Sequence, residues 1–411
     1  MQFVLFIGAV IAVLLLAFIS LAYSHRFFQK KGDLVLEVVA LANDGVNHLL
    51  HNHIEVNDSV YLAIEKDNRD QSLIAHKSYW GIFEKLAVHS KSPHNEYTKV
   101  ALAGGRFDKR NSYSLFLREN NRPLVLVGAS KLQGKLLLPK DGVRPGNMGG
   151  KSFTGIVSPP SDILVSKEQL PVINTSITDH IKMWLEGHFE DEMELTAMNY
   201  PLRLKNSFKN NTQLIYSDSP LQLTSAELVG NIIIYSSSRI RIGRETTVKD
   251  VIFIAPVIEI ERGFKGTLQV IASQKVTVES KVTLNYPSAL ILYNHKMKNS
   301  QATIHLGEHS LVKGAVVYWG EEGEKEQFFN AQVKIEETAV IEGEVYCSKA
   351  VELLGEVRGS VTTSYFTVNK FGSVYQNHIY GGRLDVNMLH ENYTGLIYDT
   401  DQNKKVVKWL Y

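Results

Sequence analysis

The feature that most constrains this chain is a repeat of apolar residue pairs in its C-terminal half. Each pair occupies positions i and i+2, and successive pairs recur about every 18 residues. The pairs are Leu221/Leu223, Ile240/Ile242, Ile258/Ile260, Val276/Val278, Ile304/Leu306, Val333/Ile335 and Val351/Leu353. A second cluster follows most pairs and contains a small or turn-forming residue, as at Gly230, Asp250, Gly266, Gly314 and Gly343. A repeat of this length in strand-forming residues predicts a β-solenoid, which is an architecture of stacked strands.

The spacing inside each repeat predicts the shape of the coil. Apolar residues fall near every sixth position, as at Ile258, Phe264, Val270, Val276 and Val282. Three sides of about six residues make a triangular coil, and strand alternation sends one row of side chains inward and one outward. The expected outward positions carry Arg241, Glu259, Thr277 and Lys334. The two ends of such a coil are exposed sheet edges, which must be capped or used for assembly.

The N-terminus predicts a membrane anchor. Residues 3–23 carry no charge, and this run is long enough to cross a bilayer as a helix. A cleaved signal peptide fits less well, because the basic n-region and a clear cleavage site are both missing. We therefore expect a retained single-pass anchor whose partner is the lipid bilayer. The basic residues Arg26, Lys30 and Lys31 follow the span, so the positive-inside rule alone favours a cytoplasmic location for the rest of the chain.

Changes in pattern along the chain predict seven segments. An amphipathic stem helix continues the anchor, either directly or after a break at Gly32, and short strands then indicate a small membrane-proximal α+β domain. Residues 119–122 are predicted as a hairpin turn between strands at 113–117 and 124–127. The segments are 1–25 (anchor), 26–53 (stem), 54–120 (α+β domain), 121–155 (first rungs), 156–212 (insertion with a helix near 177–195), 213–364 (β-helix) and 365–411 (a C-terminal cap that folds back).

Composition excludes some classes of function. The net charge is +1, so the chain has no strong field for nucleic acid. Its one cysteine, Cys347, lies in a strand-like run and is expected to face the core rather than to act as a nucleophile.

Several patterns resemble parts of catalytic or metal sites, but each has a simpler structural interpretation. His48, His51 and His53 follow the stem without a carboxylate pair to complete a metal site. His305 and His309 would suit an acyltransferase base, and Asp250 with Arg239, Arg241 or Arg244 would suit polysaccharide cleavage. Residues 149–152 lack the upstream glycine of a phosphate loop, and Ser130 and Ser152 have no His/Asp partner that the sequence can place. We therefore expect no catalytic, cofactor-binding or metal-binding residues and no cofactor.

The six-residue periodicity resembles that of the bactofilins, a family of polymer-forming scaffold proteins. The rungs from Val333 to Val361 carry this resemblance, which covers roughly half the chain. It implies a right-handed β-helix. The membrane anchor, the membrane-proximal domain and the insertions depart from a plain bactofilin.

The N-terminal plan is similar to that of minor pilins and pseudopilins, with a short tail, an apolar helix, a stem and then a β-rich domain. The prepilin junction and the glutamate inside the apolar span are absent, so the resemblance is to an accessory component rather than to a pilin subunit. It implies that the bulk of the chain is extracytoplasmic, at the inner membrane of a bacterium.

Together these patterns predict a mostly β protein with a single N-terminal transmembrane helix, a small membrane-proximal α+β domain and a triangular parallel β-helix of about 18 residues per rung, whose right-handedness is implied by the bactofilin resemblance alone. The expected function is that of a non-enzymatic scaffold in a pilus-like or secretion-related envelope assembly. Its partners would be envelope proteins or other copies of the chain, bound through the faces of the β-helix and the polar loops 294–302 and 320–330. The alternatives are a protein that binds or cleaves envelope polysaccharide and a cytoplasmic, bactofilin-like cytoskeletal element.

Overall fold

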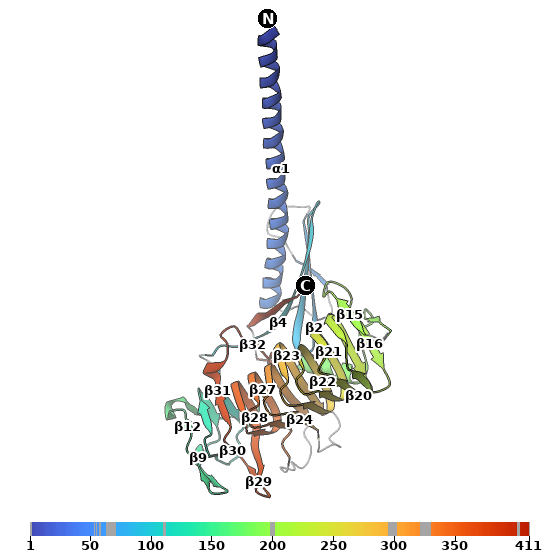
Figure 1. Cartoon of the computed structure of the whole chain (residues 1–411). Helices are drawn as coiled ribbons and strands as arrows, with labels where there is room; N and C mark the ends of the chain where they lie inside the picture. The colour runs from blue at the N-terminus through green and yellow to red at the C-terminus, as the bar shows by residue number, and fades with distance from the viewer. Residues whose placement is uncertain are drawn as a thin grey trace. The chain divides into compact units, whose positions relative to one another are not determined.

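The computed structural model describes residues 2–52, 54, 56, 59–62, 71–109, 112–197, 202–294, 302–320, 330–400 and 403–410. These residues form a mostly β protein with one long N-terminal helix (Figure 1). The chain divides into two compact units. The first holds Met1–Ser78 and Leu86–Val100, and the second holds Tyr79–Lys85 and Ala101–Tyr411.

The first unit begins with helix α1 (Gln2–His51), which is continuous. The helix therefore continues into the stem without a break at Gly32. A glycine in a helix interior costs only about 1 kcal/mol, which the helix-forming residues on both sides outweigh. Side chains 2–33 of this helix are exposed, and the segment is long and apolar enough to cross a membrane.

The C-terminal half of α1 packs against strands of the same unit. Val38, Ala42 and Val46 are buried at helical spacing. The helix approaches the sheet closely at Gly45, where an added Cβ would lie only 2.6 Å from Val88 Cγ1. Ser90 Oγ donates a hydrogen bond to the Val38 carbonyl oxygen at 2.9 Å. Four strands of this sheet lie side by side in the order β1 (Ser59–Tyr61), β2 (Ser72–Trp80), β3 (Phe83–Lys91) and β4 (Glu96–Arg106). The boundary between the two units passes through β2, β3 and β4.

The second unit contains most of the strands and a short helix. Its first elements are β5 (Leu115–Leu117), β6 (Leu124–Val127), β7 (Lys131–Gln133), β8 (Leu136–Leu138), β9 (Val143–Pro145), β10 (Asn147–Met148), β11 (Lys151–Ser152), β12 (Ile156–Val157), η1 (Pro160–Asp162), β13 (Ile163–Val165), α2 (Thr175–Leu185), β14 (Glu194–Leu195) and β15 (Arg203–Asn206). Next come β16 (Gln213–Ser217), β17 (Leu221–Leu223), β18 (Glu227–Gly230), β19 (Ile232–Ser236), β20 (Arg239–Ile242), β21 (Thr247–Ile260), β22 (Lys265–Val278), β23 (Thr283–Asn294), β24 (Thr303–Leu306), β25 (Leu311–Gly320), β26 (Val333–Ile335), β27 (Val340–Leu353) and β28 (Glu356–Lys370). The last are β29 (Ser373–Gln376), β30 (His378–Tyr380), β31 (Arg383–Asp385), η2 (Val386–Met388), β32 (Thr394–Gly395) and β33 (Lys404–Leu410).

The apolar pairs of the sequence repeat form columns in a parallel sheet. Each strand from β16 to β28 pairs in parallel with strands one repeat further along the chain, and Figure 1 shows β21, β22, β27 and β28 in this stack. The first member of each predicted pair lies in register with the next, in the order Leu221, Ile240, Ile258, Val276, Ile304, Val333, Val351. All seven are buried, and the residue between the two members of a pair points away from this core. The predicted alternation is therefore confirmed.

The small residues of the second cluster lie where neighbouring backbones approach closely. Gly314, Gly343 and Gly359 are in register on β25, β27 and β28, with φ of 140°, 153° and 157°. A Cβ on Gly343 would stand 1.8 Å from the Gly314 carbonyl oxygen, and one on Gly359 would stand 1.8 Å from the Gly343 oxygen. These positions require glycine because both the φ angle and the space exclude a side chain.

The order of the stack differs from the sequence-based expectation. Residues 121–155 were expected to form its first rungs, next to the strand that begins at Gln213. Instead β5 pairs with β28, and β7 pairs with β31, so the N-terminal strands continue the stack beyond its C-terminal strands. Figure 1 shows β12, which pairs with β7, near the red β31. The predicted hairpin at 119–122 is also wrong, because β5 and β6 belong to different sheets.

The segment from 365 onward does more than cap the stack. β31 pairs in parallel with both β28 and β7, so it lies between the C-terminal and N-terminal strands. β30 pairs in parallel with β6. The expectation that this segment loses the repeat is therefore wrong at β31, which joins the two parts of the stack.

The expected helix of the insertion is present but shorter. α2 begins after Asn174, whose Oδ1 accepts a hydrogen bond from the Ile177 amide at 3.2 Å. It ends at Leu185 rather than near residue 195, because Gly187 adopts a φ of 81° just beyond the C-cap. Ile177, Ile181 and Trp184 are buried, and the helix contacts β21 and β22.

Candidate interaction surface

The histidines considered as metal ligands do not form a site in the described part of the chain. His51 Nδ1 lies 2.8 Å from the Asn47 carbonyl oxygen, which is a local contact within α1. His53 lies outside the described residues. Among the residues that are described, no group of three or more His, Cys, Asp or Glu side chains is arranged to hold a metal ion.

The histidines considered as acyltransferase bases occupy ordinary positions in the stack. His305 Nε2 lies 3.0 Å from Glu336 Oε1, on an outward-facing position of β24. His309 is in a turn with a φ of 58°, and its backbone amide donates to Thr338 Oγ1. The two side chains therefore contact different partners.

The residues considered for polysaccharide cleavage are likewise separated. Asp250 is buried and binds Lys408, whereas Arg241 Nε pairs with Glu261 Oε1 at 2.7 Å. Arg244 lies 3.6 Å from the carboxylate of its neighbour Glu245. The aspartate and the arginines thus serve different ion pairs.

Residues 149–152 form a hairpin rather than a phosphate loop. β10 and β11 are antiparallel, and Gly149 and Gly150 make the turn with positive φ. Ser152 Oγ accepts a hydrogen bond from Asn147 Nδ2 at 2.8 Å, and Ser130 Oγ donates to the Val127 carbonyl oxygen at 2.7 Å. Both serines are engaged locally.

Cys347 faces the core, as the sequence predicted. It is fully buried on β27, and burial raises the pKa of its thiol to about 12. The thiolate, which is the nucleophilic form, is therefore disfavoured at neutral pH.

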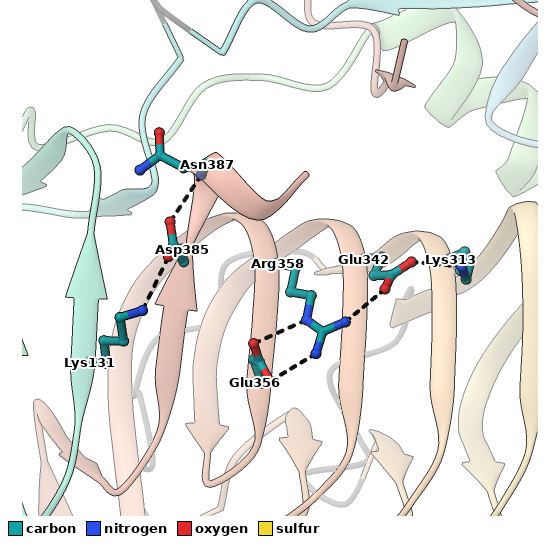
Figure 2. Close-up of polar contacts among 7 residues, drawn as sticks. All are labelled: Lys131, Lys313, Glu342, Glu356, Arg358, Asp385 and Asn387. Carbon is teal, nitrogen blue, oxygen red and sulfur yellow. Dashed lines mark hydrogen bonds and ion pairs between the residues drawn. The ribbon is translucent and has the colours of Figure 1, made fainter. Parts of the chain in front are cut away.

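A ladder of alternating charges crosses the outward face of neighbouring strands, and we call it the charge ladder (Figure 2). Lys313 on β25 binds Glu342 on β27 at 2.9 Å, and Glu342 in turn binds Arg358 on β28 at 3.0 Å. Arg358 also contacts Glu356 at 3.1 Å. The register places Arg358 between Glu342 and the position of Asp385, so the ladder follows the stacking direction.

The ladder continues across the junction with the N-terminal strands. Asp385 on β31 accepts from the Asn387 amide at 3.0 Å and pairs with Lys131 on β7 at 3.4 Å (Figure 2). Lys313 and Arg358 hold the pKa of the Glu342 carboxyl below its usual range, against the effect of its burial. The alternation of sign favours one stacking register, because a slipped strand would place like charges opposite each other.

A second cluster of titratable residues lies around α2, and no sequence pattern indicates it. His180 is buried with its ring 4.3 Å from that of Trp184, and its Nε2 lies 3.4 Å from Glu190 Oε1. Lys85 lies near this cluster, and burial lowers the pKa of its amine. The amphipathic pattern of α2 identifies His180 only as one residue of the apolar face of the helix. It does not reveal the cluster, because Lys85 and Glu190 come from other segments of the chain.

We expect the His180 cluster to make stability depend on pH. Burial, with a smaller effect of Lys85, lowers the pKa of His180 from 6.5 to about 4. The unfolded chain therefore binds more protons between these values, so the free energy of unfolding should fall by about 3 kcal/mol as pH drops from 7 to 4. Urea unfolding across this range measures the effect.

A matched pair of variants isolates His180. His180→Phe keeps an aromatic ring beside Trp184 but does not titrate, so it should flatten the pH dependence between 4 and 6.5. The exposed His188, which lies 3.7 Å from Glu186, provides the control His188→Gln, which should leave the slope unchanged. An unchanged slope in His180→Phe contradicts this assignment.

The polar loops expected to bind partners fall mostly outside the described residues. Only Asn294, Ala302, Gly320 and Asn330, at or next to their ends, are described. The charge ladder, by contrast, is an outward surface whose geometry the structure does define.

Comparisons with known proteins do not assign a family. No protein-family model matches the chain, and no curated protein matches its sequence. Among solved structures, the competence-associated pilin ComZ from Thermus thermophilus aligns over 93% of this chain and 94% of its own, with 8% sequence identity and a TM-score of 0.23. A TM-score of this size does not establish a shared fold.

Proposed function

We propose that this protein is a membrane-anchored scaffold of a bacterial cell envelope, in which a rigid parallel β-helix presents binding surfaces to other proteins. The observation that carries the proposal is the register of the buried columns, in which strands one repeat apart stack in parallel over an apolar core. Three-sided coiling of this stack, as in a β-helix, accounts for the recurrence of each strand position after about 18 residues.

Exposed apolar side chains on β13 support a role in assembly. This strand pairs in parallel with β8, and its residues Leu164 and Val165 are exposed. Exposed apolar side chains that lie together favour contact with another chain. We propose that an envelope protein or a second copy covers these two side chains, as expected for an accessory component of a pilus-like or secretion assembly.

A topology experiment tests the extracytoplasmic placement. Full-length protein with a C-terminal epitope is produced in a bacterial host, and intact spheroplasts are treated with proteinase K. Loss of the epitope before lysis supports an envelope scaffold. Protection until lysis rejects that placement and favours the cytoplasmic, bactofilin-like scaffold.

Charges introduced into the apolar half of α1 should release the protein from the membrane. Ile11 and Leu14 are exposed in a helix long enough to span a bilayer, and arginine near the centre of such a helix costs about 3 kcal/mol per residue. We expect Ile11→Arg/Leu14→Arg to move most of the chain from the carbonate-resistant membrane fraction to the soluble fraction. The control Ile11→Leu/Leu14→Ile should remain in the membrane, and retention of the arginine variant contradicts a spanning helix.

A further inference from the structure

We infer that the second unit contains a binding site for a neutral saccharide, in a pocket of about 650 Å³ on the outward face of β28 and β5. This inference does not depend on the proposed scaffold function. We call this cavity the Phe116 pocket, after the aromatic residue on its floor.

The floor of the Phe116 pocket is a row of outward side chains from neighbouring strands. Thr362 on β28 is in register with Phe116 on β5, which is in register with Leu137 on β8. Ser360 lies beside them on β28. All four residues are largely buried although they point away from the apolar columns of the stack. The floor therefore combines an apolar strip with two hydroxyl groups.

The walls of the pocket are held by backbone hydrogen bonds. The segment that ends at Val172 runs beside Tyr398 and Asp399, and the Asp399 amide donates to the Val172 carbonyl oxygen at 3.0 Å. The Asp399 carboxylate binds the Thr175 amide and hydroxyl at 3.0 and 2.7 Å. These contacts preorganise the wall, so a ligand would meet a formed site.

Aromatic rings line the pocket at several positions. Tyr113 lines the pocket and is 39% exposed, so a ligand can reach its side chain. Phe107 is held edge-to-face against Tyr393, with ring centroids 5.6 Å apart, and it also lines the pocket with Tyr398. The negative face of an aromatic ring attracts the weakly positive C–H groups on one side of a sugar ring. Aromatic rings beside hydroxyl groups are thus suited to a pyranose.

The charges of the lining favour a neutral ligand. Arg106 and Lys167 supply two positive charges, and Glu344 and Asp399 supply two negative ones. Glu344 is buried, and its Oε2 accepts a hydrogen bond from the Leu396 amide at 2.8 Å. A site with this balance has no net preference for an anion or a cation, whereas its charged groups still form strong hydrogen bonds to hydroxyls.

Two hydroxyl groups remain available for such bonds. In the described part of the chain, Ser360 and Thr362 make no side-chain hydrogen bonds, yet both line the pocket and are only 8% exposed. A ligand with several hydroxyls would satisfy them, and an apolar ligand would leave them unpaired at a cost.

The test uses the full-length protein in nanodiscs, because sugar-headed detergents would compete for the pocket. Maltose and chitobiose are titrated by calorimetry beside glucuronate and dodecanoate, with a dissociation constant on the order of 0.1 mM expected for the better neutral disaccharide. Tyr113→Ala should weaken this binding about tenfold, and Thr362→Val, which keeps the shape but removes the hydroxyl, about fivefold. The control Tyr216→Ala removes a tyrosine that is 45% exposed outside the pocket, and it should bind normally.

Each outcome decides the inference. The inference is supported if a neutral disaccharide binds and both pocket variants weaken this binding while their thermal midpoints stay unchanged. Absence of binding by both neutral disaccharides at about 10 mM overturns it. Binding that neither variant changes, or tighter binding of glucuronate or dodecanoate, also overturns it.

Discussion

Replacing Lys408 by methionine should destabilise the protein by about 3 kcal/mol, because it leaves a buried carboxylate without its counter-ion. Lys408 Nζ on β33 lies 2.6 and 2.7 Å from the two oxygens of Asp250. The Asp250 side chain is 2% exposed and that of Lys408 is 25% exposed, so we take the lower end of the range for a broken buried pair. The midpoint of urea unfolding, measured on the full-length protein, reports the loss.

A double variant distinguishes loss of the charge pair from loss of packing. Asp250 adopts a φ of 63°, which asparagine tolerates better than most residues, so Asp250→Asn preserves the backbone while it removes the charge. Asp250→Asn/Lys408→Met should therefore be more stable than Lys408→Met alone. Lys405, which is on the same strand and has an exposed contact with Asn392, provides the control Lys405→Met with a change below about 0.5 kcal/mol. Equal effects of Lys405→Met and Lys408→Met would refute the argument.

Gly343→Ala should destabilise the stack by about 4 kcal/mol or prevent folding. The added Cβ would lie 1.8 Å from the Gly314 carbonyl oxygen, so β25 and β27 would have to separate. Backbone strain at a φ of 153° adds about 1–3 kcal/mol for a residue with a side chain. Thermal unfolding of the full-length protein, followed by circular dichroism, measures the loss.

Gly372 provides the matched control, because it separates backbone strain from the clash. Its φ is 72°, and a Cβ at this position meets nothing within 4 Å. Gly372→Ala should therefore cost only about 1–2 kcal/mol, which is the strain of a left-handed conformation alone. If both glycine variants lose the same stability, close approach of the strands is not what requires Gly343.

The pair of lysines on β33 was not predictable from the sequence. Lys404 binds Glu84 at 2.7 Å, and Lys408 binds Asp250, yet both lysines lie in a C-terminal segment whose partners are far away in sequence. The sequence marks Asp250 as a turn-forming residue of the repeat and as a candidate catalytic acid. Its buried position and its cationic partner come only from the packing of β33 in the second unit.

The Phe116 pocket was equally hidden. Its floor takes Thr362 from β28 and Phe116 from β5, which are more than two hundred positions apart in the chain. No spacing within the sequence brings these residues together. The polar loops that the sequence did single out lie largely outside the described residues, so their predicted role in binding stays a prediction.

The uncharged run of residues 3–23 was sufficient to predict the long apolar helix. Local periodicity was sufficient to predict the strand-rich C-terminal half and the inward columns from Leu221 to Val351, because burial on one face imposes its own spacing on neighbouring residues. Periodicity does not record which repeat stacks on which. The parallel pairing of β5 and β7 with β28 and β31 places the N-terminal strands after the C-terminal ones, and only the tertiary structure decides this. The physical reason is that strands of similar pattern can pair in many orders, and the order is selected by long-range contacts such as Lys131 with Asp385.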